Sequence, residues 1–347
     1  MTEQNSAESS RPQSREPERS GPESGAPESS AARQSGTRQN RVARRTALGL
    51  AAAAPAAVVL ASPAGAAHAA TAAGPAPRPV HRLRARSEIG RIRLSWEHDP
   101  GKPFVDHYAV YGAKTPGFAI GPDTLIAKTI YASFSHDRMG GRRQDWHYRV
   151  VTVDAAGNRS RPTAQISAHS TESVAVSGTP LATVGTFDHK SLEFALAPNR
   201  SAQYRTRFPN GVDYTHGTGR PETDWSYIQP GPSDAWGGNK VTRATFRFAV
   251  DQVPAEPWLS IWLLDTHASL AGTIVLGLNG TAFTEVKLEG GAMRGSLEGD
   301  ATVPGTTLKP SYVELALPAL TTGENVLTID KKLGSWHVYD ALGIFTR

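Results

Sequence analysis

The stretch that decides the fold is DWHYRVVTVDAAGNRS, residues 145–160. Its side chains alternate with a period of two, which places one set on each side of an extended chain. The two sets are Tyr148, Val150 and Thr152, and Arg149, Val151 and Val153. The run ends at Ala156-Gly157-Asn158, residues typical of a tight turn. The pattern predicts a β-strand followed by a sharp reversal of the chain.

Similar short runs, separated by Gly, Pro, Asn and Asp, fill residues 80–170. They are RIRLSWEHD (91–99), VDHYAVYGA (105–113) and LIAKTIYASFSHD (125–137). No long segment with a 3.6-residue period interrupts them. Regularly spaced strands of this kind indicate an all-β sandwich or barrel. We therefore expect a first β-sandwich over residues 80–170.

A second series of strands follows the polar stretch HSTESVAVSGTP and covers residues 181–347. Its members are RATFRFAV (243–250), WLSIWLLD (258–265), GTIVLGLNG (272–280), YVELALP (312–318), NVLTIDK (325–331) and VYDALGIFTR (338–347). The second reads as a fully buried strand, and Asn279-Gly280 is a hairpin signal. About eight strands without helices predict a jelly roll. The fold class is therefore all-β, with two tandem sandwiches.

The residues before position 80 differ in composition. Residues 1–43 are polar and Pro-rich, with almost nothing apolar to bury, so we expect a disordered leader. Residues 44–69 open with Arg44-Arg45, continue in an Ala-rich apolar run and close with Ala67-His68-Ala69, the three parts of a secretory signal. The leader and arginine pair resemble a twin-arginine export signal. Residues 70–79 read as a Pro/Ala linker.

Charge and cysteine content limit the partners and the compartment. Residues 1–69 account for +2 of the net charge of +5, and the rest is spread without a basic block. This distribution argues against nucleic-acid binding. The chain has no cysteine, so the exported protein must be stable without disulfides. We expect a secreted, extracellular protein with no membrane segment after signal removal; its oligomeric state stays open.

The first unit resembles a fibronectin type III domain over its whole length. Trp96, in RIRLSWEHD, stands where that family has its early core tryptophan, and Tyr148, in YRVVTVDAAGNRS, where it has its late-strand tyrosine. The resemblance implies that both rings pack in the core. It also implies a role as spacer or scaffold, without chemistry.

The second unit resembles the C-terminal, galactose-binding-like module (domain III) of the rhamnogalacturonan lyases, polysaccharide lyase family 4. The resemblance rests on TVGTFDHKSLEF (183–194), TDWSYIQPGPSDAWGG (223–238), TFRFAV (245–250), WLSIWLLDTH (258–267), VLGLNG (275–280), GENVLTI (323–329) and VYDALGIF (338–345), in that order. That family places a fibronectin-like domain directly before this module. The resemblance implies binding of pectic, rhamnogalacturonan-type polysaccharide.

Catalysis does not follow from this resemblance. The catalytic lysine and histidine of those lyases lie in an N-terminal domain, whose place is taken here by the leader and signal, so no catalytic residue is carried over. Asp265-Thr266-His267 has the spacing of an acid–histidine dyad, but it also suits a turn after a strand. Asp188, Asp224, Asp234 and Asp340 leave a glycosidase pair open. A minimal lyase or hydrolase, and a cell-surface adhesion module, remain the alternatives to a non-catalytic binder.

Two aromatic clusters are the candidate sugar-binding residues. Aromatic rings stack on the C–H faces of a pyranose, and neighbouring polar groups bind its hydroxyls. The candidates are Trp225, Tyr227, Asp234 and Trp236 in one Gly/Pro-rich loop, and Trp336 and Tyr339 before the closing strand. The alternative is that these rings anchor irregular loops to the core.

No cofactor is expected, apart from a structural calcium of the kind that jelly-roll sugar binders often carry. Carboxylates and carbonyls hold this ion. Asp188 and Asp340, one near each terminal strand of the second unit, are the candidate ligands.

Overall fold

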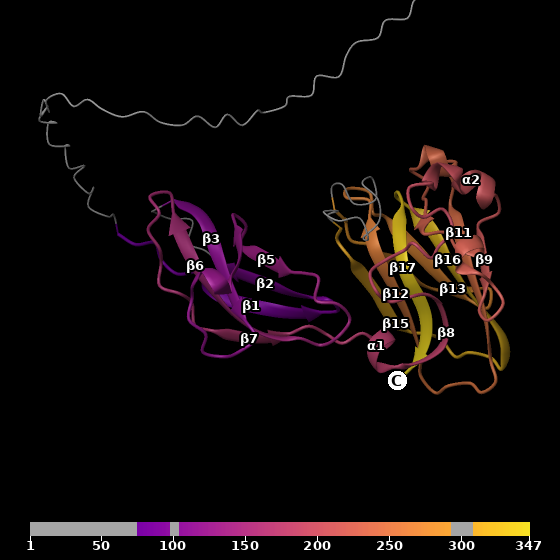
Figure 1. Cartoon of the computed structure of the whole chain (residues 1–347), viewed down its shortest axis with the longest axis horizontal. Helices are drawn as coiled ribbons and strands as arrows, with labels where there is room; N and C mark the ends of the chain where they lie inside the picture. The colour runs from indigo at the N-terminus through magenta and orange to yellow at the C-terminus, as the bar shows by residue number, and fades with distance from the viewer. Residues whose placement is uncertain (1–74, 98–103, 293–307) are drawn as a thin grey trace, which may run out of the picture. The chain divides into compact units, whose positions relative to one another are not determined.

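The computed structural model describes residues 75–97, 104–292 and 308–347. The predicted leader, the signal and the first half of the linker (70–74) lie outside these residues. His68–Arg347 form one compact unit, and almost all its regular structure is β-strand. The all-β prediction is confirmed, and Figure 1 labels most of the strands. Within the described residues no helix is long and apolar enough to cross a membrane.

The first sandwich consists of two antiparallel sheets. One sheet has the order β1-β2-β5, formed by β1 (His81–Glu88), β2 (Arg91–Glu97) and β5 (Ser133–His136). The other has the order β4-β3-β6-β7, formed by β4 (Leu125–Thr129), β3 (Val105–Ala113), β6 (Asp145–Asp154) and β7 (Ile166–His169). A short 3-10 helix, η1 (Pro122–Thr124), precedes β4. Each strand expected from the alternating sequence is present.

The alternation in β6 has the predicted effect. Tyr148 and Val150 are fully buried between the two sheets, and Trp96 packs edge-on against Tyr108 with ring centroids 5.3 Å apart. The reversal after β6 is also as predicted. Asp154 Oδ1 accepts hydrogen bonds from the N–H groups of Ala156 and Asn158, and Gly157 has a φ of 82°. Only glycine adopts this conformation without strain.

The second sandwich consists of two five-stranded sheets. One contains β10 (Ile228–Gln229), β17 (His337–Thr346), β12 (Pro257–Thr266) and β15 (Ser311–Ala316) in that order, with β8 (Thr179–Gly185) also paired to β17. The other has the order β14 (Thr281–Lys287), β13 (Thr273–Leu278), β16 (Gly323–Leu333), β11 (Thr242–Val250) and β9 (Val212–Thr215). The helices between strands are single turns: α1 (Val174–Ser177), α2 (Tyr204–Arg207), α3 (Pro221–Asp224), η2 (Ser201–Gln203) and η3 (Ala235–Gly237).

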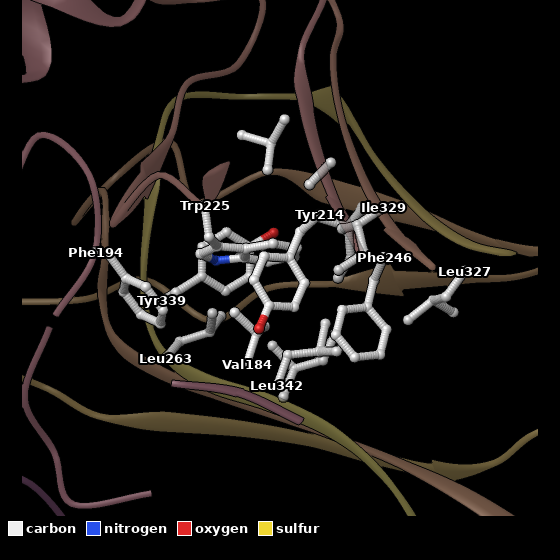
Figure 2. Close-up of a cluster of buried hydrophobic side chains, with 14 of the residues drawn as sticks. Val184, Phe194, Tyr214, Trp225, Phe246, Leu263, Leu327, Ile329, Tyr339 and Leu342 are labelled. Atoms are coloured by element: carbon white, nitrogen blue, oxygen red, sulfur yellow. The ribbon is translucent and has the colours of Figure 1, made fainter. Parts of the chain in front are cut away.

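The core of the second sandwich lies between these sheets (Figure 2). Phe246 and Phe248 point inward from β11, whereas Arg243 of the same strand is exposed and pairs with Asp330. The strand β12 is buried at nearly every position, as its continuous apolar sequence predicts. The hairpin between β13 and β14 turns at Asn279-Gly280, both with positive φ. Burial of the inward set is the main stabilising term of such a sheet pair.

Within the compact unit, residues of the first sandwich contact residues of the second. Gly90, in the β1–β2 turn, lies against the ring of Tyr312, where a Cβ atom would come within 2.4 Å of that ring. Trp262 Nε1 donates a hydrogen bond at 3.2 Å to Ser173 Oγ, in the segment that joins the two sandwiches. Arg93 Nη2 donates to both oxygens of Glu289, at 2.6 and 2.7 Å. The β1–β2 hairpin is therefore in contact with β15 and with the chain after β14.

Candidate functional site

Three of the six predicted sugar-binding residues are core residues. Trp225, Tyr227 and Tyr339 are at most 3% exposed, and Trp225 packs against Tyr339 at 5.2 Å between ring centroids (Figure 2). None of these rings presents a face to solvent, so the interpretation of the three as stacking platforms is corrected. The physical reason is that the chain after α3 runs against the core and pairs with β17 through β10, which turns these rings inward. Buried aromatic side chains then anchor the irregular chain to the core.

Tyr339 is also part of a buried polar network. Its hydroxyl donates to Gln229 Oε1 at 2.5 Å, and Gln229 Nε2 donates to the carbonyl oxygens of Thr242 and Ile329, both at 3.0 Å. A buried amide is tolerated because all of these bonds are made. The network ties β10 and β17 to strands of the facing sheet.

Asp234 is buried and joins two loops. Its Oδ2 accepts from the N–H of Gly231 at 2.8 Å, and its Oδ1 accepts from Ser335 Oγ at 2.5 Å. The backbone N–H of Ser233 also donates to the carbonyl of Gly334 at 3.0 Å. Both carboxylate oxygens of Asp234 are therefore engaged inside the protein. Asp234 therefore joins loops 230–239 and 333–336 and is not free to bind sugar hydroxyls as predicted. We call this pair of contacts the Asp234 clasp.

The clasp brings the remaining two candidates onto adjoining loops. Trp236 and Trp336 are partly exposed and pack against the edge of the core. Trp236 lies edge-on to Tyr204 at 6.4 Å, and Trp336 lies edge-on to His267 at 5.7 Å. We call loops 230–239 and 333–336, with His267, the tryptophan edge. Its rings are held by packing and retain part of their surface, an arrangement suited to stacking on an apolar sugar face.

His267, considered from the sequence only as part of an acid–histidine dyad, and Lys331, which was not singled out, complete this region. Lys331 is fully buried below the loops, and its Nζ donates to the carbonyl of Ala271. Burial lowers the pKa of Lys331 to about 7, although the charge of Asp234 opposes this shift. His337 is fully buried as well, and burial, followed by the charge of Lys331, lowers its pKa. The signal that could have found Lys331 is the strand period of two, because Leu327, Ile329 and Lys331 share the inward face of β16 whereas Lys332 is exposed.

Asp265 and His267 do not form a dyad. Asp265 is buried, and its Oδ1 accepts from the N–H groups of Thr266 and Ala292 at 3.0 and 2.9 Å. His267 Nδ1 accepts from the N–H of Leu270 at 3.1 Å, so each side chain stabilises a different turn. Burial raises the pKa of Asp265 to about 6, against the effect of the backbone N–H groups. The turn interpretation explains both residues.

The acids considered for a glycosidase pair have structural partners too. Asp224 Oδ2 accepts from the N–H of Arg220 at 2.9 Å and closes the single turn α3. Asp188 and Asp340, the candidate calcium ligands, both accept from the N–H of Lys190, at 3.0 and 2.9 Å. The structure therefore brings these two carboxylates together.

A calcium ion needs more than this pair. It takes six to eight oxygen ligands, and the described residues contain no group of three or more His, Cys, Asp or Glu side chains arranged to hold a metal. Asp340 Oδ2 is buried without a hydrogen-bond partner, and burial raises the pKa of Asp340 to about 8. The pair supplies fewer oxygen ligands than calcium takes, so it does not fit a calcium site well.

Comparisons with known proteins give the following. No family model matches the chain, and no curated protein matches it. Among solved structures, the chain is similar to the fibronectin type III domain of human fibronectin type III domain containing protein 3, with 14% identity over 31% of this chain and 97% of that one and a TM-score of 0.26.

Two alpha-L-rhamnosidases are also similar. The enzyme from Dictyoglumus thermophilum has 10% identity, 74% coverage of this chain, 25% of that chain and a TM-score of 0.24. The Streptomyces avermitilis enzyme, in complex with L-rhamnose, has 14% identity, 77% coverage of this chain, 22% of that chain and a TM-score of 0.20. The chain thus spans about a quarter of the length of these enzymes.

Proposed function

We propose that the chain is a secreted, non-catalytic carbohydrate-binding protein that recognises pectic, rhamnogalacturonan-type polysaccharide of plant cell walls. The observation that carries the proposal is the tryptophan edge, where Trp236 and Trp336 keep exposed surface on loops joined through Asp234 and Ser335. The sequence motifs shared with the lyase domain III module support the pectic ligand. Weak binding per site is expected, because ordering a flexible polysaccharide has an entropic cost.

Affinity electrophoresis of the full chain through gels containing rhamnogalacturonan, pectin or a neutral glucan tests this function. Retardation by the pectic polymers is the expected result. Trp236→Ala and Trp336→Ala should each weaken binding roughly three- to tenfold, as expected for loss of one aromatic contact. Trp258→Ala is the matched control, because Trp258 is also partly exposed. It stands at the start of β12, whereas the tryptophan edge adjoins the end of that strand, where Thr266 pairs with His337. Migration of the folded chain unchanged in every gel would overturn the proposal.

The non-catalytic part has its own test. A lyase would release an unsaturated product that absorbs in the ultraviolet, and a hydrolase would release reducing ends. Neither signal should rise when the full chain is incubated with rhamnogalacturonan. A rise in either signal that disappears in the Asp265→Asn variant would show that the protein is an enzyme.

Export through the twin-arginine route belongs to the same proposal. Replacement of both Arg44 and Arg45 by lysine should keep the protein inside the cell, as measured by immunoblot of the medium. Undiminished secretion of this double variant would instead indicate the general secretory route.

A further inference from the structure

A cleft of about 580 Å³ lies between the β1–β2 hairpin and the chain around β15, and none of the tryptophan edge residues is among those that line it. It is lined by three arginines, two glutamates and a tyrosine: Arg86, Arg91, Arg93, Glu88, Glu289 and Tyr312. We call it the arginine cleft. Its volume is in the range of small-ligand sites, which is roughly 300–1,000 Å³.

The charges in the arginine cleft form a network with one cation in excess. Arg93 Nε donates to both oxygens of Glu88, at 2.8 and 2.9 Å, and its Nη2 donates to Glu289. Three guanidinium groups face two carboxylates, which leaves a net charge of about +1 in the lining. Burial alone would lower the pKa of Arg93, but the hydrogen bonds and charges of Glu88 and Glu289 outweigh this effect and raise it overall. Arg93 therefore stays positively charged.

Arg86 is the cation that this network leaves without a close partner. Arg91 is 6% exposed, and its Nε and Nη1 form ion pairs with Glu88 and Glu289 at 2.8 and 2.9 Å, so its charge is compensated inside the protein. Arg86 reaches Glu88 only at 3.5 Å, and its side chain is 80% exposed. A guanidinium group that keeps most of its surface at the edge of a cleft favours a ligand that supplies negatively charged oxygen atoms.

The walls favour a ligand larger than a simple ion. The ring of Tyr312 packs on Gly90, and its hydroxyl lies 2.8 Å from His189 Nε2, so the tyrosine is fixed in place. The guanidinium group is planar and matches a carboxylate with two parallel hydrogen bonds. A fixed aromatic wall beside such groups suits a sugar ring that carries a carboxylate.

We propose that the arginine cleft binds the carboxylate of an acidic sugar residue, a uronate, in the polysaccharide. This site rests on the proposed function and deepens it, since it gives the protein a preference for de-esterified over esterified pectin. The tryptophan edge contacts the sugar rings of acidic and esterified polysaccharide alike. The arginine cleft binds the free carboxylate and so distinguishes the acidic form.

Calorimetric titration of the full chain with oligogalacturonates, in acid and in fully methyl-esterified form, tests the site. We expect the acid form to bind roughly tenfold more tightly, the effect of a charge-assisted hydrogen-bond pair. Arg86→Gln should remove most of this ratio and leave the folded spectrum unchanged, because Arg86 is exposed and has only one long contact. Arg243→Gln is the matched control: its side chain is 57% exposed and pairs with Asp330 on the outer face of β11.

Each outcome decides a separate statement. Equal affinity for acid and ester, or a ratio that survives in Arg86→Gln, would overturn the uronate site while leaving the proposed function intact. Competition by inorganic phosphate as strong as by galacturonate would show a general anion site and overturn the sugar assignment. Absence of binding to both forms, together with unchanged migration in pectin gels, would overturn the proposed function itself. Loss of the ratio in Arg86→Gln alone supports the site.

Discussion

The tryptophan edge and the arginine cleft are built in opposite ways. The tryptophan edge consists of neutral rings on loops, held by buried anchors such as Trp225 and by the Asp234 clasp. The arginine cleft consists of charged side chains on the β1–β2 hairpin and of Glu289 after β14, held by pairs between Arg93, Glu88 and Glu289. The first therefore depends on the packing beneath it, and the second on electrostatics at its surface.

The two surfaces therefore recognise different properties of a ligand: the tryptophan edge its apolar ring faces, and the arginine cleft its charge. A ring contact contributes by dispersion and burial of apolar area, which salt hardly changes. Ion pairs in a partly open cleft are screened by salt and contribute more to specificity than to affinity. Four measurements can break or sharpen the comparison.

The largest effect is expected for the support of the tryptophan edge. Trp225→Ala removes a fully buried ring that contacts Tyr214, Phe246 and Tyr339, and should lower the free energy of unfolding by roughly 3–5 kcal/mol. Urea unfolding followed by fluorescence measures this. Trp336→Ala, which removes a partly exposed ring, should cost much less. Equal losses in the two variants would contradict the division between anchor and surface ring.

A second effect comes from Lys331 below the tryptophan edge. Its pKa is about 7 in the folded chain and about 10.4 when unfolded, so between these values the unfolded state binds more protons. The free energy of unfolding therefore rises with pH in this window, with a slope of up to roughly 1.4 kcal/mol per pH unit. Below the folded pKa of about 7, Lys331 carries its proton in both states and adds no slope.

Lys331→Met should remove that slope, measured as the difference from the unsubstituted chain in urea unfolding at successive pH values. Lys332→Met is the control, because Lys332 is exposed and pairs with Glu285 at the surface. Parallel curves for Lys331→Met and the unsubstituted chain would show that Lys331 is not buried as a neutral amine.

A smaller effect distinguishes the two surfaces by salt. Raising NaCl from about 0.1 M to about 1 M shortens the Debye length from about 10 Å to about 3 Å. The preference for acidic over esterified oligogalacturonate should fall several-fold, while the affinity for the esterified form stays nearly constant. Titration calorimetry at both salt concentrations gives the two numbers. An equal decrease for both forms would mean that charge also governs the tryptophan edge.

The smallest effect is expected from calcium. Because the described residues hold no group of three or more His, Cys, Asp or Glu side chains arranged around Asp340 to bind a metal, neither CaCl₂ nor a chelator should move the thermal unfolding midpoint by more than the error of the scan. Asp340→Asn, which keeps the shape of a protonated acid, should unfold at nearly the same temperature. A clear rise with calcium that Asp340→Asn abolishes would restore the calcium site.

Most of the strand pattern was predictable from the sequence. The period of two in residues 145–154 predicted a strand, although both of its faces are buried from Val150 to Val153, and Asn279-Gly280 marked a hairpin that the structure contains. The candidate site was predictable only in part. All six aromatic and acidic candidates lie in or next to the tryptophan edge, but four of them are buried.

The sequence by itself determined the all-β class, because strand periodicity and turn chemistry are local properties of the chain. Only the tertiary structure decided that Trp225 is an anchor and Trp336 a surface ring, since burial depends on what packs above each residue. It also decided that Arg93 meets Glu289, 196 positions later in the sequence. Contacts of that separation arise from sheet pairing and packing, which no local pattern encodes.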